Sequence, residues 1–466
     1  MKKRILTKLI AGVILAAMTQ SAFADDAADA RALIKKAQNT DLGMQTVQSL
    51  TTEIGPRLAG SEAEARARDW AVKRLKALGF ANVHVEPFTL EGWHRGDISV
   101  HVGDPYPQRL VATALGRSVG TPVGGITAPV VRFVTLKDLK DAPMGSLKGK
   151  IAFVDEIMTR TQEGMGYGVA VQKRSAGPSI AAERGALALI IRSAGTDYHR
   201  NAHTGALKYD DKQPRIPAAA LSNNDADQLA RLLALKPGIP LTLTMSSKRI
   251  GQVPSGNVVG EIPGSDYPDE VVLLGAHLDS WDEGTGAIDD GTGVAIVTTA
   301  AKLVAGHGQP KRTIRVVLFG SEEPGLIGAK AYVKAHKDDM GKIIMVSESD
   351  FGTGQIWRMN TGIAKQDEAR ADAILQVLRP LGVLPGRREA SGGSDVSVLS
   401  AAGAPAVSFT QNGWDYFDLH HTPDDTFDKV IKEDLNQNIA VYAAFAWMAA
   451  NAEGGFHPPE HPSSEE

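Results

Sequence analysis

The clearest pattern along this chain of 466 residues is an alternation of short apolar runs with longer stretches of helical periodicity. After residue 255, apolar runs predict buried strands at 271–276, 313–319, 343–347 and 405–410. Between and after them, the spacing of apolar positions predicts helices near 291–305, 325–337, 367–381 and 433–451. This order is typical of an α/β fold with a mixed, mostly parallel sheet flanked by helices.

The beginning of the chain has a similar pattern. Residues 30–52 are predicted to form one helix, and a second helix is expected from Ser61. Glu64 follows Ser61 by three residues, which predicts a capping box. The alternating segment 82–90 predicts a strand. Residues 25–117 and 251–450 are therefore expected to form two parts of one domain.

Residues 118–250 interrupt this pattern and predict an inserted, β-rich accessory domain. Short apolar runs lie between glycine- and proline-rich turns, and only two short helices are expected, near 179–184 and 225–235. His199 and His203 stand alone in a polar loop, so a solvated surface position is expected for both. The segment is predicted to shape access to a site without taking part in its chemistry.

Both ends of the chain differ from the rest. Basic residues at 2–4 and 8, an apolar run at 9–18 and Ala22-Phe23-Ala24 are typical of a signal peptide cleaved after Ala24. We therefore expect a periplasmic or secreted protein that has no membrane segment after cleavage. The Pro/Ser/Glu-rich tail at 451–466 is predicted to be disordered, with His457 and His461 in solvent.

Composition narrows the chemistry. The chain is 43% hydrophobic and 22% charged, which is enough for a large core. Removal of residues 1–24 takes away four basic and no acidic residues, so the formal net charge changes from −4 to −8. That balance argues against a nucleic-acid partner. Because the chain has no cysteine, a bound metal would need His, Asp and Glu ligands.

Such ligands gather where predicted strands end. The segments are 277–290, with His277, Asp279, Asp282, Glu283, Asp289 and Asp290; 322–323, with Glu322 and Glu323; 348–350, with Glu348 and Asp350; and 420–425, with His420, His421, Asp424 and Asp425. Each segment alone could be an acidic loop or a favourable helix start. Four distant segments with the same character indicate a metal site at the carboxyl edge of the sheet.

The residue types suit two metal ions. Ions about 3.5–4 Å apart need one carboxylate that touches both, and each needs further His or carboxylate ligands. A nearby acid that is not a ligand can move a proton from the attacking water to the leaving amine. The adjacent glutamates 322 and 323 suit this division, because neighbouring side chains can point in different directions.

The motifs HLDSWDEGTGAIDDGTG, SEEPG, ESD and HHTPDDT, with IGPRLAGS near the start, resemble the two-zinc exopeptidases of peptidase family M28. The resemblance covers nearly the whole mature chain and implies a protease-associated domain at 118–250. It implies two Zn²⁺ ions, the first held by His277 and Asp350, the second by Glu323 and His421, and both by Asp289. Glu322 would be the general base for a metal-bridged water, and Asp279 would orient the site.

Some assignments within the motifs rest on alignment alone. Asp289 is preferred over Asp290, and His421 over His420, on that basis, and a cis peptide between Asp289 and Asp290 is implied by the family. In the stretch SGGSD and after it, Ser394, Asp395 and Tyr416 are candidate substrate contacts, although each equally suits a structural loop.

The function expected is therefore a secreted di-zinc metallo-exopeptidase that hydrolyses short peptides or dipeptides. The alternatives are an enzyme like the single-zinc glutaminyl cyclases and a binding relative without catalysis. Two complete ligand sets favour hydrolysis, and the resemblance also implies a homodimer. The preferred side chain and the end from which peptides are cut stay open.

Overall fold

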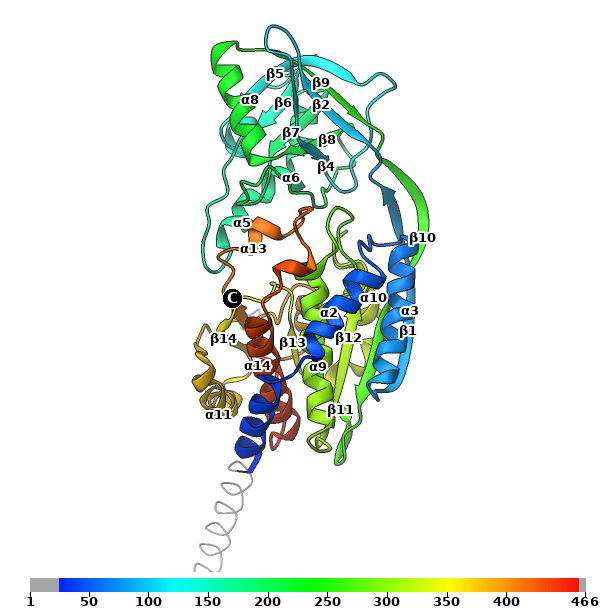
Figure 1. The fold of residues 1–466 in the computed structure, drawn as a ribbon, viewed down its shortest axis with the longest axis vertical. Coiled ribbons are helices and arrows are strands. Elements are labelled where there is room, and N and C mark those ends of the chain that lie inside the picture. Colours follow the sequence, from blue (N-terminus) through cyan, green and yellow to red (C-terminus); the bar gives the residue numbers. More distant parts are fainter. Residues whose placement is uncertain (1–24, 461–466) are drawn as a thin grey trace, which may run out of the picture.

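The computed structural model describes residues 25–460, which form two α/β bodies stacked along the long axis (Figure 1). Each body is built on an eight-stranded sheet. We call the elements around the first sheet the large body and those from Ile98 to Met245 the small body. The predicted signal peptide and His461 lie outside the described residues. Within residues 25–460, no helix combines the length and apolar character needed to cross a lipid bilayer.

The sheet of the large body is mixed, with a parallel centre. Its four central strands β12, β11, β13 and β16 run parallel, whereas β10 and β14 pair with them in the antiparallel sense. In spatial order the strands are β1 (Ala81–His94), β10 (Lys248–Ile262), β12 (Arg312–Phe319), β11 (Tyr267–His277), β13 (Ile343–Glu348), β16 (Ala406–Gln411), β14 (Ile356–Gly362) and β15 (Leu384–Pro385). The predicted fold class is confirmed.

Helices cover both faces of this sheet. The central helix α9 is buried along most of its length, because α14 and α2 pack on it from outside. A helix that is apolar on nearly all sides is expected in such an interior position. The helices of the large body include α2 (Leu42–Glu53), α3 (Glu62–Ala77), α9 (Thr292–Ala305), α10 (Ile327–Ala335), α11 (Glu368–Leu378), α12 (Val396–Ala401), α13 (Tyr416–Leu419) and α14 (Lys432–Asn451).

The small body has its own sheet and its own apolar core. In spatial order its strands are β3 (Gln108–Leu110), β2 (Ile98–Val102), β9 (Pro240–Met245), β5 (Ile126–Phe133), β6 (Ile151–Val154), β7 (Ala188–Arg192), β8 (Ala218–Leu221) and β4 (Ala112–Ala114). Its helices are α4 (Leu136–Asp141), α5 (Met165–Ala170), α6 (Gln172–Ser175), α7 (Gly177–Glu183) and α8 (Asn223–Leu235). Three of its strands precede residue 118, where the accessory segment was expected to begin.

The chain passes between the bodies along one antiparallel ribbon. Strand β1 leaves the large body and β10 returns to it, and the two strands pair from Ala81 opposite Glu261 to His94 opposite Lys248. Figure 1 shows this ribbon curving along one side of the molecule. A two-stranded connection of this length places the small body over one end of the large one.

Three local predictions differ from the structure. The helix expected over 30–52 is interrupted at 38–41, where Asn436 of α14 donates its side-chain amide to the carbonyl oxygens of Gln38 and Thr40. Ser61 caps α3 as expected, but the side chain of Glu64 accepts from Ser255 Oγ at 3.0 Å instead of closing a capping box.

The tail was expected to be disordered from residue 451, and its described part is not. Phe456 is buried in the core of the large body. The backbone N–H of His457 donates to Asp367 Oδ2 at 2.7 Å, so a specific contact continues at least to this residue. The apolar Phe456 was the local signal against disorder.

Candidate active site

Four parallel strands end at one edge of the large sheet, and the acidic segments follow them there. His277 is the last residue of β11, and Glu322 and Glu323 come shortly after β12. Asp350 follows β13, and His421 lies in the loop beyond β16. The carboxyl edge of a parallel sheet is where α/β proteins bind ligands, and here it brings together side chains up to 144 positions apart.

Asp289 lies at the centre of this group. Its Oδ1 is 3.0 Å from His277 Nε2, and its Oδ2 is 3.2 Å from His421 Nε2. His277 Nε2 is also 3.4 Å from Asp350 Oδ1, and His421 Nε2 is 2.9 Å from Glu323 Oε2. One carboxylate therefore faces two separate pairs, each made of a histidine and an acid.

Both histidines are turned so that Nε2 faces the acids. His277 Nδ1 donates to the carbonyl oxygen of Asp279 at 2.9 Å, and His421 Nδ1 lies 3.3 Å from the carbonyl oxygen of Thr204. These partners favour the tautomer with hydrogen on Nδ1, which leaves the Nε2 lone pair directed at carboxylate oxygens. Two acceptors facing each other at such distances need a proton or a metal ion between them.

The neighbouring aspartates fix the backbone of the site. Asp279 accepts from the backbone N–H groups of Glu322 at 3.0 Å and Glu323 at 3.3 Å. Asp290 accepts from the backbone N–H groups of His277 at 3.0 Å and Gly293 at 3.1 Å, so its carboxylate holds backbone although it lies within 4.8 Å of donor atoms of His277 and Asp350. The peptide bond between Asp289 and Asp290 is cis, as the motif implied.

The buried carboxylates at this edge of the sheet would be stabilised by added positive charge. Burial raises the pKa of Glu322 well above its ordinary value. The Asp350 and Glu323 carboxylates raise this pKa further, whereas the nearby His277 lowers it. Burial likewise raises the pKa of Glu348 to about 8. Glu323 Oε1 is buried without a hydrogen-bond partner among the described residues. Uncompensated buried carboxylates are costly, and metal coordination is a standard way to stabilise them.

The distances also suit metal ligands. Donor atoms about 2.0–2.1 Å from a tetrahedral ion lie roughly 3.3 Å from one another. The contacts of 2.9–3.4 Å around Asp289 fall near that value. The donor set contains only imidazole nitrogen and carboxylate oxygen, which suits Zn²⁺. The residues at this edge therefore fit the zinc ions that the motif implies.

A pocket of about 450 Å³ opens onto these side chains. Ser394 and Tyr416, both candidate substrate contacts, line it, and Ser394 Oγ donates to Asp350 Oδ2. Phe351, Phe417 and Leu326 supply apolar wall. Asp395 is fully buried and lies outside the lining, so its position does not support a direct contact with a substrate.

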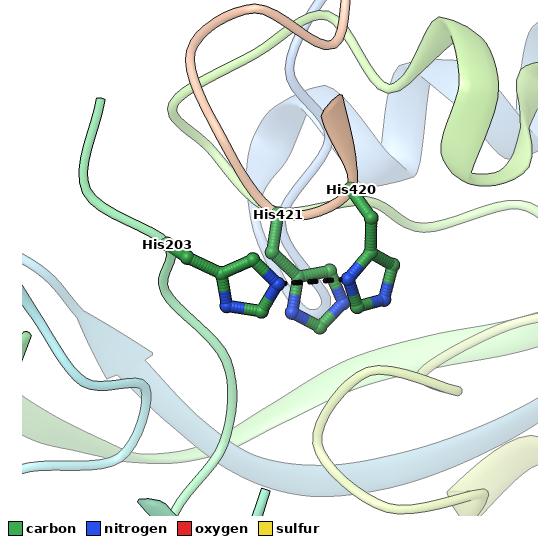
Figure 2. Close-up of side chains that lie close together, drawn as sticks. All are labelled: His203, His420 and His421. Atoms are coloured by element: carbon green, nitrogen blue, oxygen red, sulfur yellow. Dashed lines mark hydrogen bonds between the residues drawn. The ribbon is translucent and has the colours of Figure 1, made fainter. Parts of the chain in front are cut away.

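The prediction of a solvated His203 is wrong. His203 is 1% exposed, and its Nε2 lies 2.9 Å from His420 Nδ1 (Figure 2). The backbone N–H of Thr204 donates to the carbonyl oxygen of His421 at 3.0 Å, which holds the small body against this loop. His199, by contrast, has a 71% exposed side chain, as expected.

His203 and His420 form a chain of contacts that ends on Asp289. Burial lowers the pKa of both histidines well below the ordinary value, so each ring is neutral with one N–H group. His203 Nε2 donating to His420 Nδ1 leaves His420 Nε2 to donate to Asp289 Oδ2, at 3.4 Å. A third metal ion at this histidine cluster is disfavoured, because the Arg174 guanidinium lies 3.4 Å from His421 Nδ1.

The small body contributes more to the pocket than the sequence pattern indicated. Tyr167 of α5 and Arg174 of α6 line the pocket beside the residues of the large body. The Tyr167 ring stacks on Phe417 with centroids 4.6 Å apart. No local motif marks these residues, because the large-body residues that they contact lie more than 200 positions away. The segment 118–250 therefore forms part of the pocket wall, whereas the two histidine–acid pairs around Asp289 contain none of its residues.

Known proteins resemble this chain over most of its length. The profile of peptidase family M28 matches residues 257–446. Mouse carboxypeptidase Q is 36% identical over 407 residues, covering 86% of this chain and 84% of the relative. Human carboxypeptidase Q is 35% identical over 427 residues, covering 91% and 88%.

Solved structures give the same result. A peptidase M28 precursor from Shewanella amazonensis is 49% identical, superposes with a TM-score of 0.93, and is matched over 94% of this chain and 100% of its own. An aminopeptidase from Aneurinibacillus sp. strain AM-1 is 25% identical with a TM-score of 0.63, over 92% and 100%. With this coverage, and with the family's motifs gathered at one edge of the sheet, the chain belongs to peptidase family M28 and is a metallopeptidase.

Proposed function

We propose that this protein is an exported di-zinc exopeptidase that hydrolyses short peptides or dipeptides. The single observation that carries the proposal is the position of Asp289, with one oxygen toward His277 and Asp350 and the other toward His421 and Glu323. A carboxylate shared between two complete pairs suits two ions better than one. Solved relatives include a zinc aminopeptidase from Bacillus subtilis, which supports zinc as the metal.

His277 and Asp350 would hold one zinc ion, Glu323 and His421 the other, and Asp289 both. Ions bound there would supply Lewis acidity and lower the pKa of a water molecule. The chain itself orients the ligands: Asp279 and Thr204 accept from the Nδ1 atoms of His277 and His421. Such partners fix the ring orientation of a metal-ligating histidine and raise its basicity.

Glu322 is placed to act as general base and then as general acid. It lines the pocket next to Glu323, and its backbone N–H is held by Asp279 Oδ1. A carboxylate in this place can take a proton from the attacking water and deliver it to the nitrogen of the leaving amine. The buried surroundings that raise its pKa bring it closer to the neutral range, where such transfer is efficient.

The small body supports a preference for short substrates. It lies over the carboxyl edge of the large sheet and lines the pocket with Tyr167 and Arg174. A covered pocket of this size admits a flexible chain end and excludes folded protein. We assign the segment 118–250 as the core of a protease-associated domain on this basis. The relatives named carboxypeptidase Q and aminopeptidase both support terminal cleavage.

The alternatives have no comparable support. A single-zinc cyclase would not need both ligand pairs, and a non-catalytic binding relative would not need Glu322 beside them. Export after cleavage at Ala24, disorder after residue 460 and the homodimer stay predictions from the sequence.

Replacement of the proposed base should separate chemistry from metal binding. Glu322→Gln keeps the shape of the side chain but cannot accept the proton, so hydrolysis of a dipeptide should fall by about 10²–10⁴-fold or more. Zinc content and melting temperature should stay near those of the wild type. Near-normal turnover, or loss of zinc from the variant, would show that another residue is the base.

Removal of the shared carboxylate of Asp289 should, unlike Glu322→Gln, reduce zinc binding itself. Asp289→Ala should lower zinc content below two ions per chain, measured by elemental analysis, and reduce the stabilisation that added zinc gives to the folded state. Asp424→Ala is the matched control, since Asp424 lies in the loop of His421 and faces Lys429 and His199 instead. Retention of two zinc ions by Asp289→Ala would refute the bridging role.

Replacement of His203 should weaken zinc binding at the proposed metal site, although His203 lies in the small body. His203→Ala removes the partner of His420, and loss of an outer partner of a metal site typically costs about 10–100-fold in metal affinity or activity. His203→Gln, which keeps a donor, should recover part of the loss. Zinc affinity by chelator competition is the measurement, with His199→Ala as control. Equal affinities for the two alanine variants would reject the contact as functional.

A further inference from the structure

Arg174 is the only arginine or lysine among the described residues that line the active-site pocket. Its neighbours there include Asp289, Glu322, Glu323 and Asp350. A lone cation in such a pocket is well placed to attract the negative end of a substrate. The inference below rests on the proposed peptidase function and concerns which end of the peptide is bound.

Arg174 is held firmly but keeps unused hydrogen-bonding capacity. It is 7% exposed, and Nη1 donates to the carbonyl oxygen of Thr204 at 3.1 Å. The guanidinium packs on the backbone of Gly205, where a Cβ atom would lie 2.1 Å from Nη1, so only glycine leaves it room. Its Nε is buried without a partner among the described residues.

Arg174 has no acidic partner among the described residues. The buried Arg57 also lacks one, but its guanidinium donates to the carbonyl oxygens of Leu278, Thr285 and Gly286, whereas Arg174 Nε has no partner there. Arg192 pairs with Asp155 at 2.7 Å, and Arg312 pairs with Glu270 at 2.5 Å. The Arg174 guanidinium donates to the neutral Thr204 carbonyl oxygen and lies 3.4 Å from His421 Nδ1. A buried charge is costly without a charged partner, and a substrate carboxylate would supply one through a two-pronged contact.

The place of Arg174 relative to the metal ligands decides which carboxylate fits. Arg174 lies on the Nδ1 side of His421, one imidazole ring away from the acids that face Nε2. In a peptide, the carbonyl carbon that is attacked and the carboxylate of the next residue are separated by three bonds, or about 3–4 Å. A terminal carboxylate would therefore reach Arg174, while the attacked carbonyl carbon lies at the proposed metal ligands, only if the leaving group is a single residue.

We propose that Arg174 binds the free α-carboxylate of the residue that leaves, so that the enzyme removes one C-terminal residue or splits a dipeptide. An aminopeptidase acting on longer chains would place neutral backbone beside this cation and gain no ionic contact. The side chains of Asp and Glu in a substrate also carry a carboxylate. The experiment must therefore distinguish binding of such a side chain from binding of the C-terminal carboxylate.

The test compares three substrates with the zinc-loaded enzyme: Ala-Leu, Ala-Leu amide, and Ala-Glu amide, which has only a side-chain carboxylate. Wild type should prefer Ala-Leu to both amides by about 100-fold in kcat/KM. Arg174→Met should lose most of that preference, because kcat/KM for Ala-Leu should fall much more than kcat/KM for the two amides. Arg174→Lys should retain part of it, because the charge remains but the planar fork is lost.

Binding gives a readout independent of turnover. In the Glu322→Gln background, calorimetry should show that Ala-Leu binds more tightly than Ala-Leu amide. Adding Arg174→Met or Arg174→Lys should reduce the difference between the two dissociation constants. Arg231→Met, on the exposed face of α8, is the matched control and should leave all values unchanged. Zinc content and melting temperature of each variant report on the fold.

The outcomes separate the two proposals. Equal hydrolysis of Ala-Leu and its amide by wild type, or an unchanged ratio in both Arg174 variants, would overturn the role of Arg174 and leave the peptidase intact. Preference for Ala-Glu amide would also overturn it, by assigning Arg174 to a side chain. Failure of zinc-loaded wild type on every peptide would instead contradict the proposed function.

Discussion

The site depends on one buried carboxylate that faces two histidines from distant parts of the chain. Asp289 contacts His277, at the end of β11, with one oxygen, and His421, in the loop beyond β16, with the other. Although burial would raise its pKa, His420, His277 and His421 hold the pKa of Asp289 well below the ordinary value. The fold makes this possible because parallel strands end at a common edge.

The two bodies meet at this site instead of merely lying beside it. Thr204 contacts His421 through its backbone, and His203 contacts His420. On the other side, Trp281 from the loop after β11 packs into the core of the small body, and Arg95 Nε donates to Asp282 Oδ1 at 2.9 Å. A movement of the small body would therefore disturb the loops that carry the proposed metal ligands as well as the entrance to the pocket.

The fold and the acidic centre were readable from sequence because they depend on local signals. Buried strands are continuous apolar runs, and His277, Glu323 and Asp350 follow such runs directly. His203, Arg174 and Tyr167 could not be found in this way, since each reaches the site through a contact with a residue more than 200 positions distant. The break at 38–41 was missed for the same reason: Asn436 of α14 satisfies the carbonyl groups that the interrupted helix leaves free.

The most direct measurement of the central claim is anomalous X-ray diffraction from zinc-loaded crystals, on both sides of the zinc absorption edge. Two zinc ions held by Asp289 should give two peaks about 3.5–4 Å apart, one beside His277 and Asp350 and the other beside His421 and Glu323. A single peak, or a peak among His203, His420 and His421, would contradict that claim.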